Sequence, residues 1–191
     1  MSVLMQIVLI SFNKPWGVLC QFSDNSPGTE SRATLADFIS VPAVYPAGRL
    51  DQDSEGLVLL TDDGKLQQRI ANPAFGSHKC YLVQVEGVPS ASQLDRLSRG
   101  VVLNDGLARA HAVELLAKKP GCLWPRKPPI RQRKNIPVSW LKITLTEGRN
   151  RQLRRMTAAV GLPTLRLVRL TIGNHSLNGL KSGEWRIEPV H

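Results

Sequence analysis

The sequence predicts an α+β fold with a mixed, largely antiparallel sheet and flanking helices. Segments with the two-residue period of a strand and segments with the period of a helix interleave along the 191 residues. They do so without the steady strand–helix alternation that is typical of a parallel α/β sheet. No internal repeat is visible in the chain.

Each predicted element rests on a local pattern. Residues 3–12 are apolar and β-branched, and residues 56–61 (GLVLLT) are typical of a buried strand. Asp62 and Asp63 offer capping groups to a helix over residues 65–71, which Asn72-Pro73 would end. The same signals predict a short helix at 34–39, a strand at 79–86 with Tyr81, Val83 and Val85 on one face, a helix at 90–99 closed by Gly100, strands at 109–116 and 138–145, a helix at 151–160 ended by Gly161 and Pro163, and a late strand at 165–172.

Charge and composition point to a folded protein that meets a polyanion. Hydrophobic residues make up 42% of the chain, which is enough for a real core, and the formal net charge is +10. Proteins this basic commonly bind nucleic acid. A surface that is merely basic explains the charge as well, so composition alone does not decide.

The cysteines and the first ten residues indicate in which cellular compartment the protein works. Cys20, Cys80 and Cys122 are odd in number, scattered and without a CxxC pair, which favours reduced thiols in a cytosolic protein. Residues 1–10 are apolar but short for a spanning helix, and no basic region precedes them. We expect a cytoplasmic protein without a membrane segment.

Residues 120–137, PGCLWPRKPPIRQRKNIP, form a basic, proline-rich loop. Prolines exclude a regular helix or a sheet interior, because they remove backbone donors. The loop is either a solvated linker or an arm that grips phosphates, and its single sign of charge favours the arm. Its basic residues are Arg126, Lys127, Arg131, Arg133 and Lys134.

The densest polar signal is YPAGRLDQDSEGLVLLTDDG at 45–64. Two glycines bracket a loop that leads into the buried strand, a common setting for chemistry. Asp51-Gln52-Asp53 lacks the further spaced oxygen ligands of a calcium loop, so a metal site is disfavoured. A capped turn with solvated acids is the plainer alternative. The loop carries Arg49, Asp51, Asp53, Ser54 and Glu55.

A second signal is EGRNRQLRRM at 147–156. Arg151, Arg154 and Arg155 are spaced i, i+3, i+4 and would share one helical face, while Leu153 and Met156 face the core. Three like charges on one face repel unless an anion is near. That anion is RNA phosphate, a protein carboxylate or both, and a solvated basic stripe is the alternative.

These signals, with Lys79-Cys80-Tyr81 at the start of a strand, resemble the RsuA/RluE group of ribosomal RNA pseudouridine synthases. The matching stretches are FNKPWGVL at 12–19, GRLDQDSEGLVLLTDDG at 48–64, KCYLVQVEG at 79–87 and LTEGRNRQLRRMTAAVG at 145–161. The basic loop, and the lack of room before Phe12 for the S4-like domain that most of the group carries, point to large-subunit ribosomal RNA. The resemblance implies the pseudouridine synthase fold over residues 1–191, as one catalytic domain or two subdomains around a central RNA-binding cleft, with no S4-like domain.

The resemblance also implies three catalytic residues. Asp51, the aspartate of GRLD, is the implied catalytic carboxylate, acting as nucleophile or as base and electrostatic stabiliser beside a cationic sugar. Arg154 is its implied ion-pair partner, which would keep it ionised and aimed. Tyr81 is implied to stack on the uracil and to help remove the C5 proton.

The target atoms are inaccessible in a stacked helix, so the uridine must be flipped out while basic residues hold the flanking backbone. Arg49 is implied to fill the gap that the base leaves, and Leu153 to form an apolar wall. The predicted RNA-binding set is Arg49, Lys14, Leu153, Arg126, Lys127, Arg131, Arg133, Lys134, Arg149, Arg151 and Arg155.

Other functions fit less of the sequence. A non-enzymatic ribosome-binding or assembly protein explains charge and size, but not an aspartate loop with matching tyrosine and arginine positions. A nucleosidase is a second rival, and a metal nuclease is opposed by the poor ligand set. Neither GxGxxG nor GxxxxGKS occurs, and an isomerisation needs no redox or energy input, so we expect no cofactor and no metal. The expected partner is large-subunit ribosomal RNA, bound by a monomer.

Overall fold

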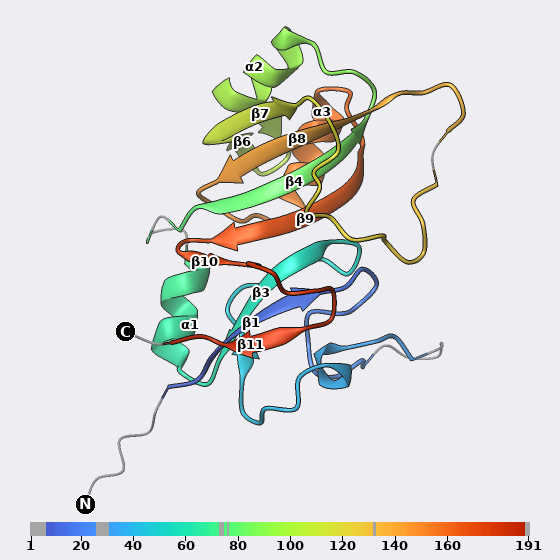
Figure 1. Cartoon of the computed structure of the whole chain (residues 1–191). Coiled ribbons are helices and arrows are strands. Elements are labelled where there is room, and N and C mark those ends of the chain that lie inside the picture. Colours follow the sequence, from blue (N-terminus) through green and yellow to red (C-terminus); the bar gives the residue numbers. More distant parts are fainter. Residues whose placement is uncertain (1–6, 26–30, 73–74, 76, 132, 190–191) are drawn as a thin grey trace, which may run out of the picture. The chain divides into compact units, whose positions relative to one another are not determined.

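The computed structural model describes residues 7–25, 31–72, 75, 77–131 and 133–189. The chain forms two compact units, Met1–Phe75 with His175–His191, and Gly76–Asn174. Each unit has its own strands and helices (Figure 1). Among the described residues, no helix is long and apolar enough to cross a membrane.

The first unit is built on antiparallel strands in the order β11-β1-β3. β1 (Leu9–Lys14) pairs with β3 (Glu55–Thr61) and with β11 (Trp185–Ile187), and the short β2 (Tyr45–Pro46) pairs with β3. All seven residues of β3 are buried, which explains why its sequence is a continuous apolar run and not an alternating one. One core cluster joins Ile10, Phe12, Val58 and Leu60 to Leu35.

Helix α1 (Gly64–Ala71) follows β3 directly. The Asp63 carboxylate accepts the backbone N–H of Leu66, which satisfies one of the donors that a helix start leaves unpaired. Leu66 and Ile70, four residues apart, form the buried face of the helix. The predicted cap and helix are therefore confirmed. Because α1 follows β3 and the Asp51 loop precedes it, the helix and the loop lie at opposite ends of this strand.

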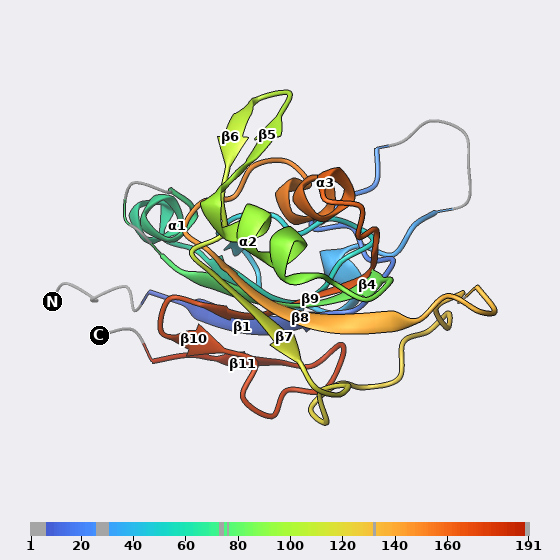
Figure 2. The same ribbon diagram turned by 90° about the horizontal axis from the view of Figure 1, so that it is seen from above.

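The second unit is an antiparallel sheet in the order β9-β4-β8-β7, with two helices on one face (Figures 1 and 2). The strands are β4 (Lys79–Glu86), β7 (Ala112–Leu116), β8 (Val138–Leu145) and β9 (Thr164–Ile172). Tyr81, Val83 and Val85 share one core cluster, as their alternation predicted. The helices are α2 (Ala91–Arg99), which Ser90 and Gln93 begin with a capping box, and α3 (Gln152–Ala159).

Four short strands complete the description. β5 (Val101–Leu103) and β6 (Gly106–Ala108) form a hairpin after α2, with Asn104 and Asp105 in its turn. This hairpin was not predicted from the sequence. β10 (His175–Ser176) and β11 lie near the end of the chain and were missed as well, because strands of two or three residues are too short for a period to show.

The predicted α+β class with a mainly antiparallel sheet is confirmed, with four corrections to element bounds. β1 is Leu9–Lys14 where 3–12 was predicted, and residues 1–6 lie outside the described residues. The helix predicted at 34–39 is a single 3-10 turn, η1 (Leu35–Asp37), that the Thr34–Asp37 capping box holds. β7 begins at Ala112 and not at residue 109, because the chain is still leaving the hairpin there. α3 begins at Gln152, since Arg151 is left-handed.

Candidate active site

Asp51 lies in a tight turn between β2 and β3 that a second loop clasps. The Gly17 N–H donates to the Gln52 carbonyl at 2.8 Å, and the Gln52 side-chain amide donates back to the Gly17 carbonyl at 3.1 Å. The turn closes through the Ser54 N–H, which donates to the Asp51 carbonyl at 3.1 Å. Gly17 and Gly48 both adopt φ near +86°, a conformation that glycine reaches without steric cost. The FNKPWGVL and GRLDQDSEG stretches therefore form one local structure around Asp51.

Lys14 anchors this clasp from inside. Its side chain is fully buried, and its Nζ donates to the carbonyls of Pro15 at 2.9 Å, Val18 at 2.8 Å and Gln52 at 3.4 Å. A buried ammonium is tolerated when acceptors surround it. Lys14 has no exposed surface for a phosphate, so the structure places it beneath the Asp51 turn and not in the predicted RNA-binding surface.

The exposed side of the turn carries Arg49. Its side chain is exposed and donates through Nη2 to the Gln21 side-chain oxygen at 2.8 Å. Asp51 is half-buried, whereas Ser54 and Glu55, which follow it, are buried. The turn therefore exposes Arg49, leaves Asp51 partly accessible and buries Ser54 and Glu55 at the start of β3.

Tyr81 and Leu153 lie in one core cluster of the second unit. Tyr81 is 7% exposed on β4 and Leu153 is 4% exposed on α3. The structure thus brings together the residues that were expected to stack on the base and to wall the pocket. Both are held by strand and helix packing, which fixes side chains more precisely than a loop does.

Two buried cations beside Tyr81 were missed by sequence reasoning. Lys79 lies two residues before Tyr81 on β4, and Arg169 is opposite Tyr81 in the β4–β9 register. Lys79 is 7% exposed and Arg169 is 3% exposed. Burial lowers the pKa of Lys79 below its ordinary value of 10.5, and the charge of Arg169 lowers it further. The sequence does show Arg169 within the mostly apolar segment that forms β9. A single sequence does not reveal, however, whether such an arginine is buried or lies exposed at the edge of a sheet.

Arg154 is half-buried on α3, and α3 is hydrogen-bonded to the first residue of β9. Its Nη1 donates to the Thr164 carbonyl at 3.4 Å, and the Thr157 and Thr164 hydroxyls lie 2.8 Å apart. Arg151 precedes the helix in the left-handed region, with φ 46° and ψ 32°. The three arginines therefore do not share one helical face, because only Arg154 and Arg155 are helical.

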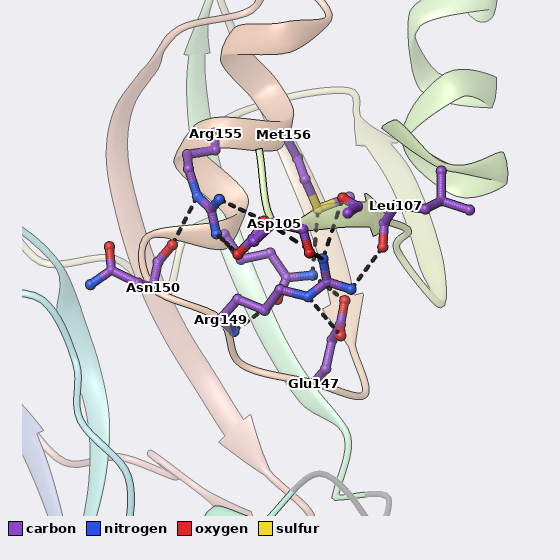
Figure 3. Close-up of polar contacts among 9 residues, drawn as sticks. Asp105, Leu107, Glu147, Arg149, Asn150, Arg155 and Met156 are labelled. Atoms are coloured by element: carbon purple, nitrogen blue, oxygen red, sulfur yellow. Dashed lines mark hydrogen bonds and ion pairs between the residues drawn. The ribbon is translucent and has the colours of Figure 1, made fainter. Parts of the chain in front are cut away.

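Arg149 and Arg155 both point toward Asp105, in the turn of the β5–β6 hairpin (Figure 3). The Arg155 guanidinium donates to both Asp105 carboxylate oxygens, at 2.8 and 2.9 Å. These bonds hold the pKa of Asp105 below its ordinary value of 3.8 and raise that of Arg155. Arg149 donates to Glu147 at 3.1 Å and to the Leu107 carbonyl at 2.7 Å. Of the three arginines for which the sequence left the anion open, Arg155 has a protein carboxylate as its partner.

The basic loop 120–137 is attached to the sheet at its start. Arg166 on β9 lies with its guanidinium carbon 5.6 Å from the centre of the Trp124 ring, and its Nη1 donates to the Trp124 carbonyl at 3.0 Å. Arg126 folds back on the carbonyls of Pro128 and Pro129. Arg133 lies 3.4 Å from Glu86, and Lys127, Arg131, Arg133 and Lys134 are exposed. The loop thus has a packed start and an exposed basic end.

Asp51, Arg49 and Lys14 belong to the first unit, whereas Tyr81, Leu153 and Arg154 belong to the second. The pairing of Asp51 with Arg154 stays a prediction. Among the described residues, no group of three or more His, Cys, Asp or Glu side chains could hold a metal ion.

Comparison with known proteins identifies the family. Residues 8–159 match the RNA pseudouridylate synthase family. The ribosomal large subunit pseudouridine synthase E of Xanthomonas campestris pv. campestris is 57% identical over 181 residues, which cover 95% of both chains. The protein of the same name from Vibrio vulnificus is 54% identical over 178 residues, covering 93% of this chain and 74% of that one.

A solved structure agrees with the sequence matches. A crystal structure described as a pseudouridylate synthase superposes with a TM-score of 0.75 at 27% identity, covering 99% of this chain and 73% of that chain. The same fold, the match over residues 8–159 and the high identity to the named relatives lead to one conclusion: the chain belongs to the RNA pseudouridylate synthase family, in the RsuA/RluE group, and is an isomerase.

Proposed function

We propose that this protein converts a uridine of large-subunit ribosomal RNA to pseudouridine, with Asp51 as the catalytic carboxylate. The assignment of the substrate rests on the 57% identity, over 95% of both chains, to a relative named ribosomal large subunit pseudouridine synthase E. The reaction would take place in the cytoplasm, on a monomeric enzyme. The clasped turn supports the role of Asp51, because it holds the backbone of this residue while its side chain stays partly exposed.

The chemistry needs two bonds to be exchanged. The bond from the ribose C1′ to N1 of uracil breaks, the base rotates, and a bond from C1′ to C5 forms. The proton on C5 leaves and N1 gains a proton, so substrate and product are isomers. Asp51 would attack C1′ or stabilise the cationic sugar, and either role requires an ionised carboxylate near the sugar.

The other predicted residues would each have a separate role in the reaction or in RNA binding. Tyr81 would stack on the flipped base and take part in removing the C5 proton, with Leu153 beside it in the same core cluster. Arg154 would pair with Asp51. Arg49 would fill the space that the base leaves, and the exposed basic end of the 120–137 loop, with Arg151, would contact phosphates.

A pseudouridine map of ribosomal RNA from cells with and without this protein tests the proposal. We expect one uridine of the large subunit to lose its modification when the protein is absent. Wild-type protein should restore the modification and Asp51→Asn should not, although the variant still folds and binds RNA. Restoration by Asp51→Asn would favour the non-enzymatic ribosome-assembly alternative, and release of free uracil would indicate a nucleosidase.

A further inference from the structure

The β5–β6 hairpin holds the segment that leads into α3. Asp105 in the hairpin turn accepts two hydrogen bonds from Arg155, and its carboxylate lies 3.7 Å from Arg149. Arg149 also donates to the carbonyls of Asp105, Gly106 and Leu107. Figure 3 shows both guanidinium groups directed at this turn. We call Asp105, Glu147, Arg149 and Arg155 the hairpin clamp.

The clamp spans a turn that local interactions do not favour. Arg151 adopts a left-handed conformation, which non-glycine residues seldom take, and its side chain gives α3 no cap. The Arg151 carbonyl accepts the helical hydrogen bond of the Arg155 N–H at 3.0 Å. The Arg155 Nε also donates to the Asn150 carbonyl at 2.9 Å. Arg155 therefore ties both the turn and the first turn of α3 to Asp105.

A second set of bonds closes the same turn. The Gln152 side-chain oxygen accepts the Arg149 N–H at 3.0 Å, and its amide nitrogen donates to Glu147 at 2.6 Å. Glu147 in turn accepts from the Arg149 Nε at 3.1 Å. Residues 147–152 are thus held as a ring, and the hairpin fixes that ring from outside. Leu153 and Arg154 follow it immediately.

The charges of the clamp balance. Two carboxylates, Asp105 and Glu147, face two guanidinium groups, Arg149 and Arg155, so the cluster carries no net charge toward a phosphate. Both arginines are also largely covered, with side-chain exposures of 27% and 32%. A cluster built to attract RNA would leave its cations unneutralised. The arrangement fits a positioning role better than the RNA contacts that the sequence predicted for Arg149 and Arg155.

We propose that Asp105 is a positioning residue for the reaction, which holds Arg149 and Arg155 so that α3 presents Leu153 and Arg154 in the productive geometry. This inference rests on the proposed function, because the geometry it protects is that of pseudouridine formation. Small displacements of a catalytic group are costly, and about 1 Å can lower a rate by about 100-fold. The hairpin thereby has a part in catalysis without touching the substrate.

The test compares Asp105→Asn with two matched variants. Asp105→Glu keeps the charge, and Asp95→Asn removes the carboxylate of an exposed pair, Asp95–Arg99 at 2.8 Å, in the same unit. Single-turnover pseudouridine formation is measured on a large-subunit RNA transcript at saturating enzyme, with RNA affinity measured separately. We expect Asp105→Asn to lower the rate of pseudouridine formation by about 10-fold or more, while its RNA affinity stays within about 2-fold of wild type. Asp105→Glu should recover part of the lost rate. Asp95→Asn should match wild type in both rate and affinity.

Two further measurements separate the clamp from the proposed function. Amide hydrogen exchange over residues 147–152 should quicken in Asp105→Asn and not in Asp95→Asn, whatever the activity of the enzyme. Arg155→Ala should quicken exchange over the same residues, because it removes both the partner of Asp105 and the donor to the Asn150 carbonyl. An unchanged rate in Asp105→Asn, or tighter RNA binding at an unchanged rate, overturns the positioning role. A wild-type protein that forms no pseudouridine contradicts the proposed function instead, while the exchange data still report on the clamp.

Discussion

The Gly17 N–H and the Gln52 carbonyl are joined by a 2.8 Å hydrogen bond, next to Asp51 in the chain. The Gln52 amide returns a bond to the Gly17 carbonyl, so two stretches that are far apart in the sequence share one local structure. Lys14 lies beneath both and donates to carbonyls of each. The position of Asp51 is therefore set by backbone contacts and by one buried cation.

Replacing Lys14 by methionine should loosen this structure. Methionine has a similar length but no donor, so the buried Val18 carbonyl loses its hydrogen bond from Lys14, at a cost of about 1–3 kcal/mol for an unsatisfied buried group, whereas the Gln52 carbonyl keeps the Gly17 N–H. We expect the free energy of unfolding to fall by this order and pseudouridine formation to fall with it. Denaturant unfolding and a rate assay measure the two effects. Lys65→Met, at an exposed position of α1, is the matched control. If both variants changed stability and rate equally, the hydrogen bonds of Lys14 would have no role beyond its positive charge.

Tyr81→Phe should separate the hydroxyl from the ring. The ring of Tyr81 packs in the core cluster with Leu153, so phenylalanine should preserve the fold and the stacking surface. We expect product formation to fall far more than RNA affinity, as measured by tritium release from C5-labelled RNA and by a binding titration. Tyr45→Phe is the control, because Tyr45 is the other tyrosine and is 60% exposed. Normal turnover by Tyr81→Phe would leave the tyrosine as a stacking wall or a core residue.

The exposed end of the 120–137 loop should contribute to the salt dependence of RNA binding. Arg131 and Lys134 are both exposed, and each phosphate contact contributes about 0.7–0.9 to the slope of log K against log salt. The double change of Arg131 and Lys134 to alanine should flatten the slope by roughly twice that amount and spare the chemistry of bound substrate. Lys118 and Lys119, exposed residues just before the loop, provide a charge-matched double variant that should change the slope less. Equal slopes for the two double variants would make the loop a plain linker.

Lys79 gives a prediction about alkaline pH. Its pKa is lowered by burial and by Arg169, so the folded protein binds fewer protons than the unfolded chain between the lowered pKa and the ordinary value of 10.5. Stability rises with pH wherever the unfolded state binds more protons. The wild-type protein should therefore gain stability relative to Lys79→Met as the pH rises toward 10.5, and show the full penalty of the buried charge at neutral pH.

Denaturant unfolding of both proteins at several pH values from 7 to 10 measures this difference. Lys142→Met, at an exposed lysine of the neighbouring strand β8, controls for the loss of one positive charge. A constant difference between wild type and Lys79→Met over the whole range would mean that the Lys79 ammonium is as well solvated in the folded protein as in the unfolded chain.

What the sequence could predict depended on how local each signal was. The Asp63 cap and the alternation around Tyr81 are local, and both were predicted correctly, whereas Ser90, predicted as the first residue of a helix, is that helix's cap. The burial of Lys14 was not predictable from one sequence, because lysines are almost always exposed unless a specific set of acceptors surrounds them. The partner of Arg155 was left open between phosphate and carboxylate, since Asp105 lies 50 residues away and only the fold brings it near.

Arg154 provides the most demanding test of the catalytic assignment. Family resemblance places the arginine after Gln152-Leu153 beside the catalytic aspartate, whereas Arg155, its neighbour on α3, is bound to Asp105. Arginine suits this role because it stays charged and can bind both carboxylate oxygens. Removing one partner of a half-buried ion pair leaves the other charge less well compensated, so each single change should lower the free energy of unfolding by less than the ~3–5 kcal/mol of a fully buried pair.

A double-mutant cycle between Asp51 and Arg154 measures this coupling directly. The variants Asp51→Asn, Arg154→Ala and their combination are compared by the free energy of unfolding, with Arg155→Ala paired with Asp51→Asn as the control cycle. We expect the combined Asp51 and Arg154 changes to cost clearly less than the sum of the single changes, since each single change already breaks the pair. The control cycle should be additive, because Arg155 acts through Asp105. Additivity in both cycles would show that Asp51 and Arg154 do not meet, and would make Arg154 one more contact to the RNA backbone.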